Sequence, residues 1–187
     1  KPSKGIILLS FNGYTPKKHL WQYPSFDSAK LSAWQEEYIM ARVGDLYGDW
    51  NVSVTTDENL FYTYPKRYRV RCVITRDTIT IPAFTWFGLQ NMQVAGRAEI
   101  NSLALKDTSA CVVSIAGTGN FTRNISDAVA HEIGHTLGLE HQSLWIYGCK
   151  VSEYNPGNVR RGPIMGVMYY SINSVWYKGR NSDGIYQ

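Results

Sequence analysis

Residues 131–141 read HEIGHTLGLEH and hold three of the four histidines in the 187-residue chain. On a helix, His131 and His135 lie one turn apart on the same face, with Cβ atoms about 5–6 Å apart, so both imidazoles can bind one metal ion. Gly138 follows three residues later, and glycine readily adopts the left-handed conformation that ends a helix in a sharp turn. That turn can bring His141 back as a third ligand.

Glu132 gives this pattern its chemistry. Three imidazoles with an open fourth position are typical of a catalytic zinc site, whereas four protein ligands close a structural one. Zinc lowers the pKa of its bound water to about 7, and a neighbouring carboxylate can take the proton and deliver it to a leaving amine. The pattern therefore predicts amide hydrolysis with a zinc-activated water and Glu132 as general base.

The alternative is a buried amphipathic helix whose histidines only pack. For two histidines four residues apart, without further features, we favour that reading. Once HExxH is present, however, the composition of this chain puts glycine at 138 and histidine at 141 by chance only about once in 550 cases. The complete pattern therefore favours the metal site.

HExxHxxGxxH resembles the zinc-binding signature of the metzincin metalloproteases, which also carry a later methionine-containing turn. Residues 162–170, GPIMGVMYY, resemble that turn. The resemblance implies that the turn methionine lies beneath the zinc ligands. Met165 is the match for this Met-turn residue, and Met168 is its rival. In some metzincins a tyrosine after this methionine approaches zinc, a role open to Tyr169 or Tyr170, for which we favour a wall of the substrate pocket.

Finer details are similar to a bacterial reprolysin-like or matrixin-like branch, although Gln142, directly after His141, leaves the subfamily open. The similar stretches are residues 8–14, LLSFNGY, and residues 51–57, NVSVTTD, together with the methionine turn. The resemblance implies one catalytic zinc ion, a polypeptide substrate and a secreted or extracytoplasmic enzyme. We expect a monomer.

The order of the expected elements resembles the upper lobe of metzincins. We predict strands over 4–11, 52–55, 67–75, 92–100 and 110–116, a helix from Asp27 to about Leu46, and a helix over about 126–138 that opens at Ser126 or Asp127. The predicted fold is α+β, with an α/β-like upper lobe containing a twisted, mixed five-stranded sheet and long helices. One catalytic domain, 1–187, would comprise this lobe (1–141), an active-site cleft and a small irregular lobe (142–187).

The cleft is expected to bind a peptide in extended form. The peptide would add as a strand to the sheet edge around residues 92–100, where Gly96 suggests a bulge, and residues 166–176 would shape its pocket. Trp145 and Tyr147 could line the cleft or pack in the lower lobe. The loop at 55–59 could bind calcium, but a solvated turn is the favoured interpretation.

Composition excludes other classes of protein. No apolar run reaches membrane-span length, and a net charge of +4 from 19 basic and 15 acidic residues forms no block suited to nucleic acid. Cys72, Cys111 and Cys149 allow at most one internal disulfide.

Two competing functions remain. One is a zinc-binding module without hydrolytic activity, which Glu132 argues against because binding alone needs no base. The other is a zinc hydrolase of a small amide, which would have a cleft closed by loops rather than an open one beside an exposed edge strand.

Overall fold

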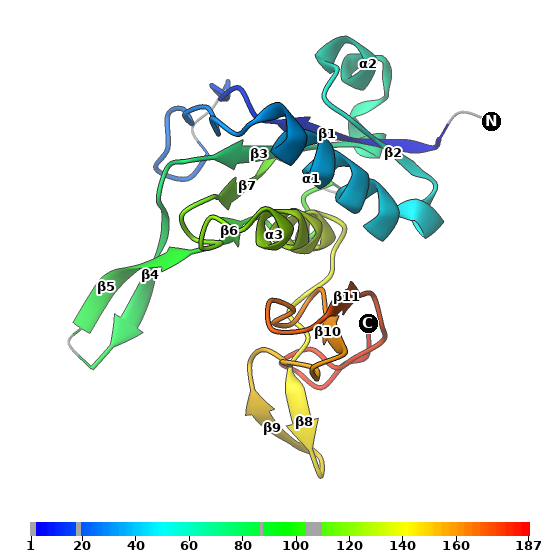
Figure 1. The fold of residues 1–187 in the computed structure, drawn as a ribbon. Coiled ribbons are helices and arrows are strands. Elements are labelled where there is room, and N and C mark those ends of the chain that lie inside the picture. Colours follow the sequence, from blue (N-terminus) through cyan, green and yellow to red (C-terminus); the bar gives the residue numbers. More distant parts are fainter. Residues whose placement is uncertain (1–2, 18–19, 87, 104–109) are drawn as a thin grey trace.

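The computed structural model describes residues 3–17, 20–86, 88–103 and 110–187. A five-stranded sheet with the order β2-β1-β3-β7-β6 forms its centre (Figure 1). Four strands are parallel: β1 (Gly5–Ser10), β2 (Val52–Thr55), β3 (Arg69–Thr75) and β7 (Ala110–Ser114). The fifth, β6 (Gly96–Arg97), is antiparallel to β7 and lies at the edge. The mixed five-stranded sheet is thus as predicted.

Two helices, α1 (Ala33–Leu46) and α3 (Thr122–Thr136), cover one face of the sheet. Ile39 of α1 and Val129 of α3 belong to the same buried cluster as the strand residues Leu9, Ile74 and Val113. Side chains alternate between the two faces along a strand, so the residues next to Leu9, Ile74 and Val113 in their strands point to the other face of the sheet. This packing holds α3 directly against the sheet.

The opposite face is covered by shorter segments. The helix α2 (Glu58–Thr63) places Phe61 against Ile6 and Leu8 of β1. Farther along the sheet, Phe26 packs on Val73 of β3 together with neighbouring apolar residues. Two short 3₁₀-helices, Gly48–Trp50 and Lys66–Tyr68, precede β2 and β3. Both faces of the central strands are therefore buried, which explains their continuous apolar runs.

Both predicted helix starts were wrong. α1 begins after Ser32, whose backbone N–H donates to Gln35 Oε1 at 3.0 Å in a capping box. Asp27 lies upstream, where its exposed carboxylate pairs with Arg76. α3 begins at Thr122, and Ser126 is inside the helix with its hydroxyl donating to the Thr122 carbonyl. Serine and aspartate suit helix caps, but tertiary packing decided where these helices begin.

The predicted strand 92–100 is divided between two structures. β5 (Gly88–Val94) pairs antiparallel with β4 (Ile79–Thr85), a strand that the sequence pattern did not predict, and the pair forms a projecting hairpin. Only β6 continues to the edge of the main sheet. The alternation of apolar residues persists across the corner at Ala95, so it could not reveal that the chain changes sheets there.

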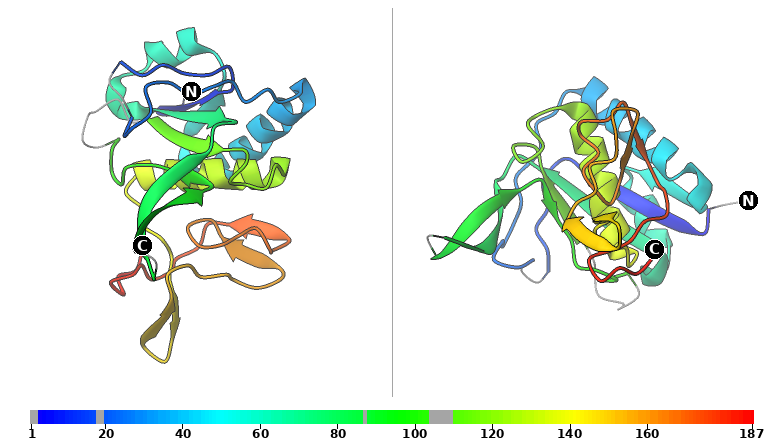
Figure 2. Two further views of the ribbon diagram at one scale, coloured as in Figure 1. Left: turned by 90° about the vertical axis from the view of Figure 1, so that its left-hand side faces the viewer. Right: turned by 90° about the horizontal axis from the view of Figure 1, so that it is seen from below.

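The remaining residues form an irregular region beneath α3 in Figure 1, and Figure 2 shows it from two further sides. It contains a hairpin of β8 (Leu144–Ile146) and β9 (Cys149–Ser152) and a parallel pair of β10 (Arg161–Pro163) and β11 (Asn173–Val175).

All three cysteines are free thiols. Among the described residues, no helix is both long and apolar enough to cross a membrane.

Candidate metal centre

The helix α3 supplies the first three residues of the site. His131, Glu132 and His135 are all buried, on the side of α3 that faces a cavity rather than the sheet. The helix is fixed from behind, because the hydroxyl of Tyr47 donates to the carbonyl of Ala130 at 2.9 Å. Its register therefore determines where the two histidines point.

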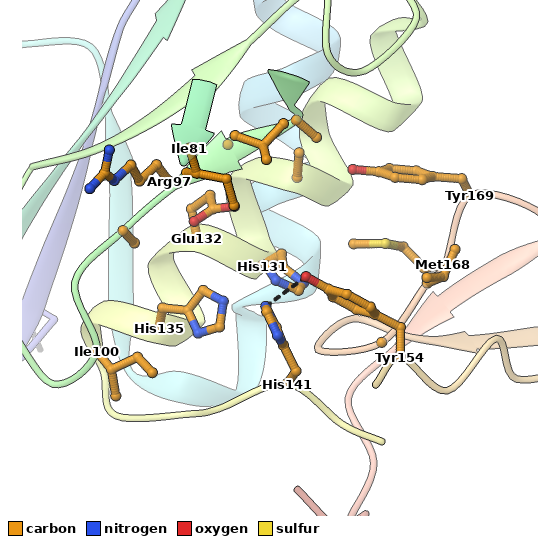
Figure 3. Close-up of a pocket in the computed structure, with 17 residues that line it drawn as sticks. Ile81, Arg97, Ile100, His131, Glu132, His135, His141, Tyr154, Met168 and Tyr169 are labelled. Atoms are coloured by element: carbon orange, nitrogen blue, oxygen red, sulfur yellow. Dashed lines mark hydrogen bonds between the residues drawn. The ribbon is translucent and has the colours of Figure 1, made fainter. Parts of the chain in front are cut away.

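Gly138 turns the chain sharply after the end of α3, as predicted from the sequence. Its φ of +100° is the left-handed conformation that favours glycine, and its N–H donates to the His135 carbonyl at 2.9 Å. The chain then reverses and brings His141 towards the helix. The ligand atoms of His131, His135 and His141 all lie within 4.8 Å of one another (Figure 3). The structure thus brings together the three histidines selected from the sequence.

Hydrogen bonds orient each imidazole. Nδ1 of His131 lies 2.7 Å from the Ile164 carbonyl, and Nδ1 of His135 lies 2.7 Å from the Leu139 carbonyl. A carbonyl only accepts, so each Nδ1 carries the proton and each Nε2 keeps its lone pair for a metal ion. This second layer of contacts is characteristic of metal-binding histidines.

His141 is held differently, by side chains from the segment after β9. Its Nδ1 lies 3.4 Å from Oε1 of Glu153, and its Nε2 lies 3.2 Å from the hydroxyl of Tyr154. The Tyr154 ring packs against the imidazole with centroids 4.3 Å apart. Lys150 and Ser182 in turn contact the Glu153 carboxylate.

The environment keeps the histidines neutral in the absence of metal. Burial, reinforced by the neighbouring histidines, lowers the pKa of His131 to about 3. Burial likewise lowers the pKa of His135 to about 4 and also lowers that of His141. Neutral imidazole is the form that binds metal, so these histidines need not lose a proton at neutral pH.

Glu132 is buried beside them, and burial raises its pKa to about 8. Its side chain lies against Gly96 of β6, where a Cβ atom would come within 2.6 Å of both Cγ and Oε1 of Glu132. The glycine at the sheet edge therefore makes room for the carboxylate. The sequence had suggested only a bulge at this glycine.

The cavity has a volume of about 460 Å³ and lies between the sheet edge and residues 166–169. Figure 3 shows Glu132 and Arg97 on one side of the histidines and Tyr154, Met168 and Tyr169 on the other. The lining residues besides the histidines, Glu132 and Tyr154 include the following: Ile81, Val94, Gly96, Ile100, Ala128, Val167, Met168 and Tyr169. Its walls are largely apolar.

The residues predicted around the methionine turn lie in different surroundings. Tyr169 lines the cavity, whereas Tyr170 is 84% exposed and is not among its lining residues. Met168 also lines the cavity. Met165 is buried beneath α3, where a Cβ atom on Gly134 would come within 2.6 Å of its Sδ. The glycine inside the HEIGH motif thus lets this methionine approach the helix.

Several other residues noted in the sequence lie outside the cavity lining. Gln142 is buried, and its N–H donates to the Met165 carbonyl at 2.7 Å. Trp145 donates to the Asn181 carbonyl, and Tyr147 is fully exposed at a hairpin turn, outside the cavity lining. In the loop at 55–59, the Asp57 carboxylate accepts two backbone N–H groups that begin α2, and calcium binding there stays a prediction.

Glu153 and Tyr154 were missed by the sequence reasoning. They follow His141 by 12 and 13 residues, and no spacing rule connects them to the motif. Only the path of the β8–β9 hairpin, which leads the chain away and back, places them beside the histidine.

Part of the chain matches a known protein family. Residues 50–142 match the model of the metallopeptidase family M12B, reprolysin-like. The match covers close to half of the chain and runs from just before β2 to the residue after His141. No curated protein matches the chain in a sequence search. The matched family and the three histidines within metal-binding distance fit a metzincin-type zinc protease, which confirms the resemblance seen in the sequence.

Proposed function

We propose that this chain, whose residues 50–142 match the reprolysin-like metallopeptidases, is a zinc-dependent endopeptidase with Glu132 as its general base. One observation carries the proposal. The ligand atoms of His131, His135 and His141 lie within 4.8 Å of one another, and the buried Glu132 lines the same cavity. Residues 1–187 would form a single catalytic domain, with 142–187 as its lower lobe.

The donor set fits zinc. Three neutral imidazoles, two of them held by carbonyls so that Nε2 is the free nitrogen, match the ligands of catalytic zinc sites and leave a position open. When bound, zinc would supply Lewis-acid polarisation of the scissile carbonyl and acidify a water molecule beside it. His131, His135 and His141 would hold the ion.

Glu132 performs the proton transfers in this mechanism. A zinc ion bound beside it would lower its raised pKa, and the ionised carboxylate would take the proton of the attacking water and later deliver it to the leaving amine. Its side chain is buried among largely apolar walls, and the close approach of Gly96 restricts where the carboxylate can move. A base held in this way needs little reorganisation during the reaction.

The substrate would lie extended along β6. In the described part of the chain β6 is the last strand of its sheet, so one of its edges has no strand beside it. A peptide can add to such an edge through backbone hydrogen bonds that depend little on sequence. Val167, Met168 and Tyr169 would form the opposite wall.

The roles around the methionine turn are also proposals. Met165 would support the histidines from beneath α3, because it packs against Gly134. Tyr169 would be a wall of the substrate pocket. Tyr170 has no assigned role, because its side chain is exposed away from the cavity lining. A monomeric, secreted enzyme agrees with the family resemblance.

A digest of a complex peptide mixture, read by mass spectrometry, tests the function. The zinc-loaded protein is compared with Glu132→Ala at equal zinc content. Cleavage by the first protein and none by the second supports an endopeptidase with Glu132 as base. If neither protein cleaves peptides although both bind zinc, a binding module or a hydrolase of small amides replaces this proposal.

A further inference from the structure

The carboxylate of Asp127 is fully buried in α3, one turn before His131. Its Oδ1 accepts hydrogen bonds from Nε and Nη2 of Arg42 in α1, at 3.0 and 2.8 Å. Its Oδ2 accepts from the hydroxyl of Ser174 in β11 at 2.7 Å and lies 3.6 Å from Nε of Arg123. A charge removed from water needs such partners, because burying it alone is costly. These four residues form the Asp127 network, which joins α1, α3 and β11.

The Asp127 network attaches the segment after β10 to the two helices. Nη2 of Arg42 also donates to the hydroxyl of Ser174 at 3.2 Å, and Nη2 of Arg123 donates to the carbonyl of Ser171. Both serines are buried. The two arginines thus hold residues 171–174 against α1 and α3, through one side chain and one backbone carbonyl.

The residues just before this segment form one wall of the candidate active site. Residues 166–169 line the cavity that contains the three histidines. On one side of this wall, Met165 packs against Gly134 of α3. On the other side, the N–H of Ser171 donates to the carbonyl of Met168 at 3.1 Å. The wall therefore spans two attachments to α3, one through Met165 and one through the Asp127 network.

Asp127 is placed to act on the wall rather than on a substrate. It is not among the described residues that line the cavity, whereas Ala128, the next residue of α3, is. Burial raises the pKa of Tyr169 in the wall, and the carboxylates of Glu132 and Asp127 raise it further. Asp127 thus lies near the wall in space as well as being joined to it through the network.

We propose that Asp127 is a positioning residue: through its network it fixes the distance between α3 and the wall 166–169, and so limits the size of the substrate side chain that the cavity accepts. This inference rests on the proposed endopeptidase function. Displacement of the segment 171–174 would leave the buried carboxylate with fewer partners, which is unfavourable in a site without water contact. If the segment is freed, the wall can move outwards and the cavity takes larger side chains.

Three variants weaken the network in different ways. Ser174→Ala removes one hydroxyl between β11 and Asp127 and leaves the ion pairs in place. Arg123→Met loses the contacts with Asp127 and with the Ser171 carbonyl. Asp127→Asn removes the charge that both arginines share. The control is Ser126→Ala, next to Asp127 in α3, because its buried hydroxyl donates to a carbonyl of its own helix.

The peptide digest that tests the function also identifies which side chains are accepted next to the cleaved bond. Two short peptides are then compared, one with the preferred side chain and one with a larger, rejected side chain. The ratio of their kcat/KM values should fall on the order of tenfold in the network variants, because a misfit of about one methylene group changes selectivity by roughly 10- to 200-fold. In Ser126→Ala the ratio should match the wild type, and zinc content should be the same in all proteins.

Two results overturn the proposal. A network variant that unfolds at lower temperature but keeps the wild-type ratio shows that the network only stabilises the fold. A variant that loses zinc shows that the network acts on the histidines instead. If Asp127→Asn does not fold, Ser174→Ala still decides the question, since it removes a single hydroxyl.

Hydrogen exchange read by mass spectrometry tests the positioning without any cleavage. The N–H groups of Val167 and Ser171 donate to backbone carbonyls on either side of the wall. Exchange in residues 166–172 should be faster in Ser174→Ala than in the wild type and in Ser126→Ala, and equal exchange overturns the proposal. A wild type that cleaves neither peptide is instead a failure of the proposed function, which this experiment distinguishes from a failure of the positioning.

Discussion

The hydroxyl of Tyr154 lies 3.2 Å from Nε2 of His141, which is the ring nitrogen that would bind a metal ion. Figure 3 shows this phenol across the histidines from Glu132. A group in that place can donate a hydrogen bond to the carbonyl oxygen of a substrate held beside the metal. The sequence left such a role open to Tyr169 or Tyr170 but favoured a wall of the substrate pocket for them, and Tyr170 is exposed and lies outside the cavity lining.

Replacing Tyr154 by phenylalanine should therefore reduce kcat more than it changes KM. Loss of a single donor to a developing oxyanion lowers kcat by about 100-fold or more in known cases. The ring contact with His141 is kept in this variant, so zinc content should not change. Steady-state kinetics with a short peptide, at matched zinc content, make the comparison. An unchanged kcat would leave Tyr154 with a packing role only.

Glu153→Gln should weaken zinc binding. The Glu153 carboxylate accepts from Nδ1 of His141, and loss of such an outer contact typically lowers metal affinity by about 10- to 100-fold. Competition with a chelator gives the zinc dissociation constant. Lys150→Gln is the matched control, because it removes only the exposed ion pair to the same carboxylate and should change the affinity little. Equal effects from both substitutions would contradict a specific role for Glu153.

The contrast between the predicted and the missed residues has a physical origin. His131, Glu132 and His135 belong to one helix, and Gly138 fixes the following turn, so local geometry alone predicts that His141 returns. Tyr154 reaches the same centre only because the β8–β9 hairpin leads the chain away and back, which no local pattern encodes. Long-range placement of this kind depends on the whole fold.

The same distinction explains the errors in the secondary structure. The buried parallel strands were predicted because continuous apolar runs report burial on both faces. The β4–β5 hairpin was not, since its alternating residues face solvent on both sides and give no sign of which strand they pair with. At the start of α3, Ser126 and Asp127 looked like caps, although the Asp127 carboxylate is buried in an ion pair with Arg42.

Glu132 should make the metal-free protein less stable as pH rises. Burial raises its pKa from 4.5 to about 8, so between these values the folded protein retains a proton that the unfolded chain has released. The free energy of unfolding then falls with increasing pH across that window. Glu132→Gln is neutral throughout, so its stability relative to the wild type should grow by a few kcal/mol from pH 4.5 to about 8.

Urea unfolding of both chelator-treated proteins across this pH range gives the difference. The histidines act in the opposite direction, because their lowered pKa values make the folded state lose protons first and its stability rise up to about pH 6.5. Both proteins share that contribution, so it cancels between them. A stability difference that does not change with pH would show that Glu132 titrates as an exposed carboxyl does.

Gly96→Ala should disable the enzyme without removing its zinc. A Cβ atom at this position would lie 2.6 Å from Cγ and Oε1 of Glu132, so the carboxylate must move away from β6. A displacement of about 1 Å in a catalytic group can cost on the order of 100-fold in rate. Gly44→Ala in α1 is the control, because a Cβ atom there meets nothing within 4 Å and alanine favours the helix. Peptide cleavage and zinc content are measured for both variants. Full activity in Gly96→Ala would mean that Glu132 does not need its position against the sheet edge, and a loss of zinc would mean that the substitution acts on the histidines instead.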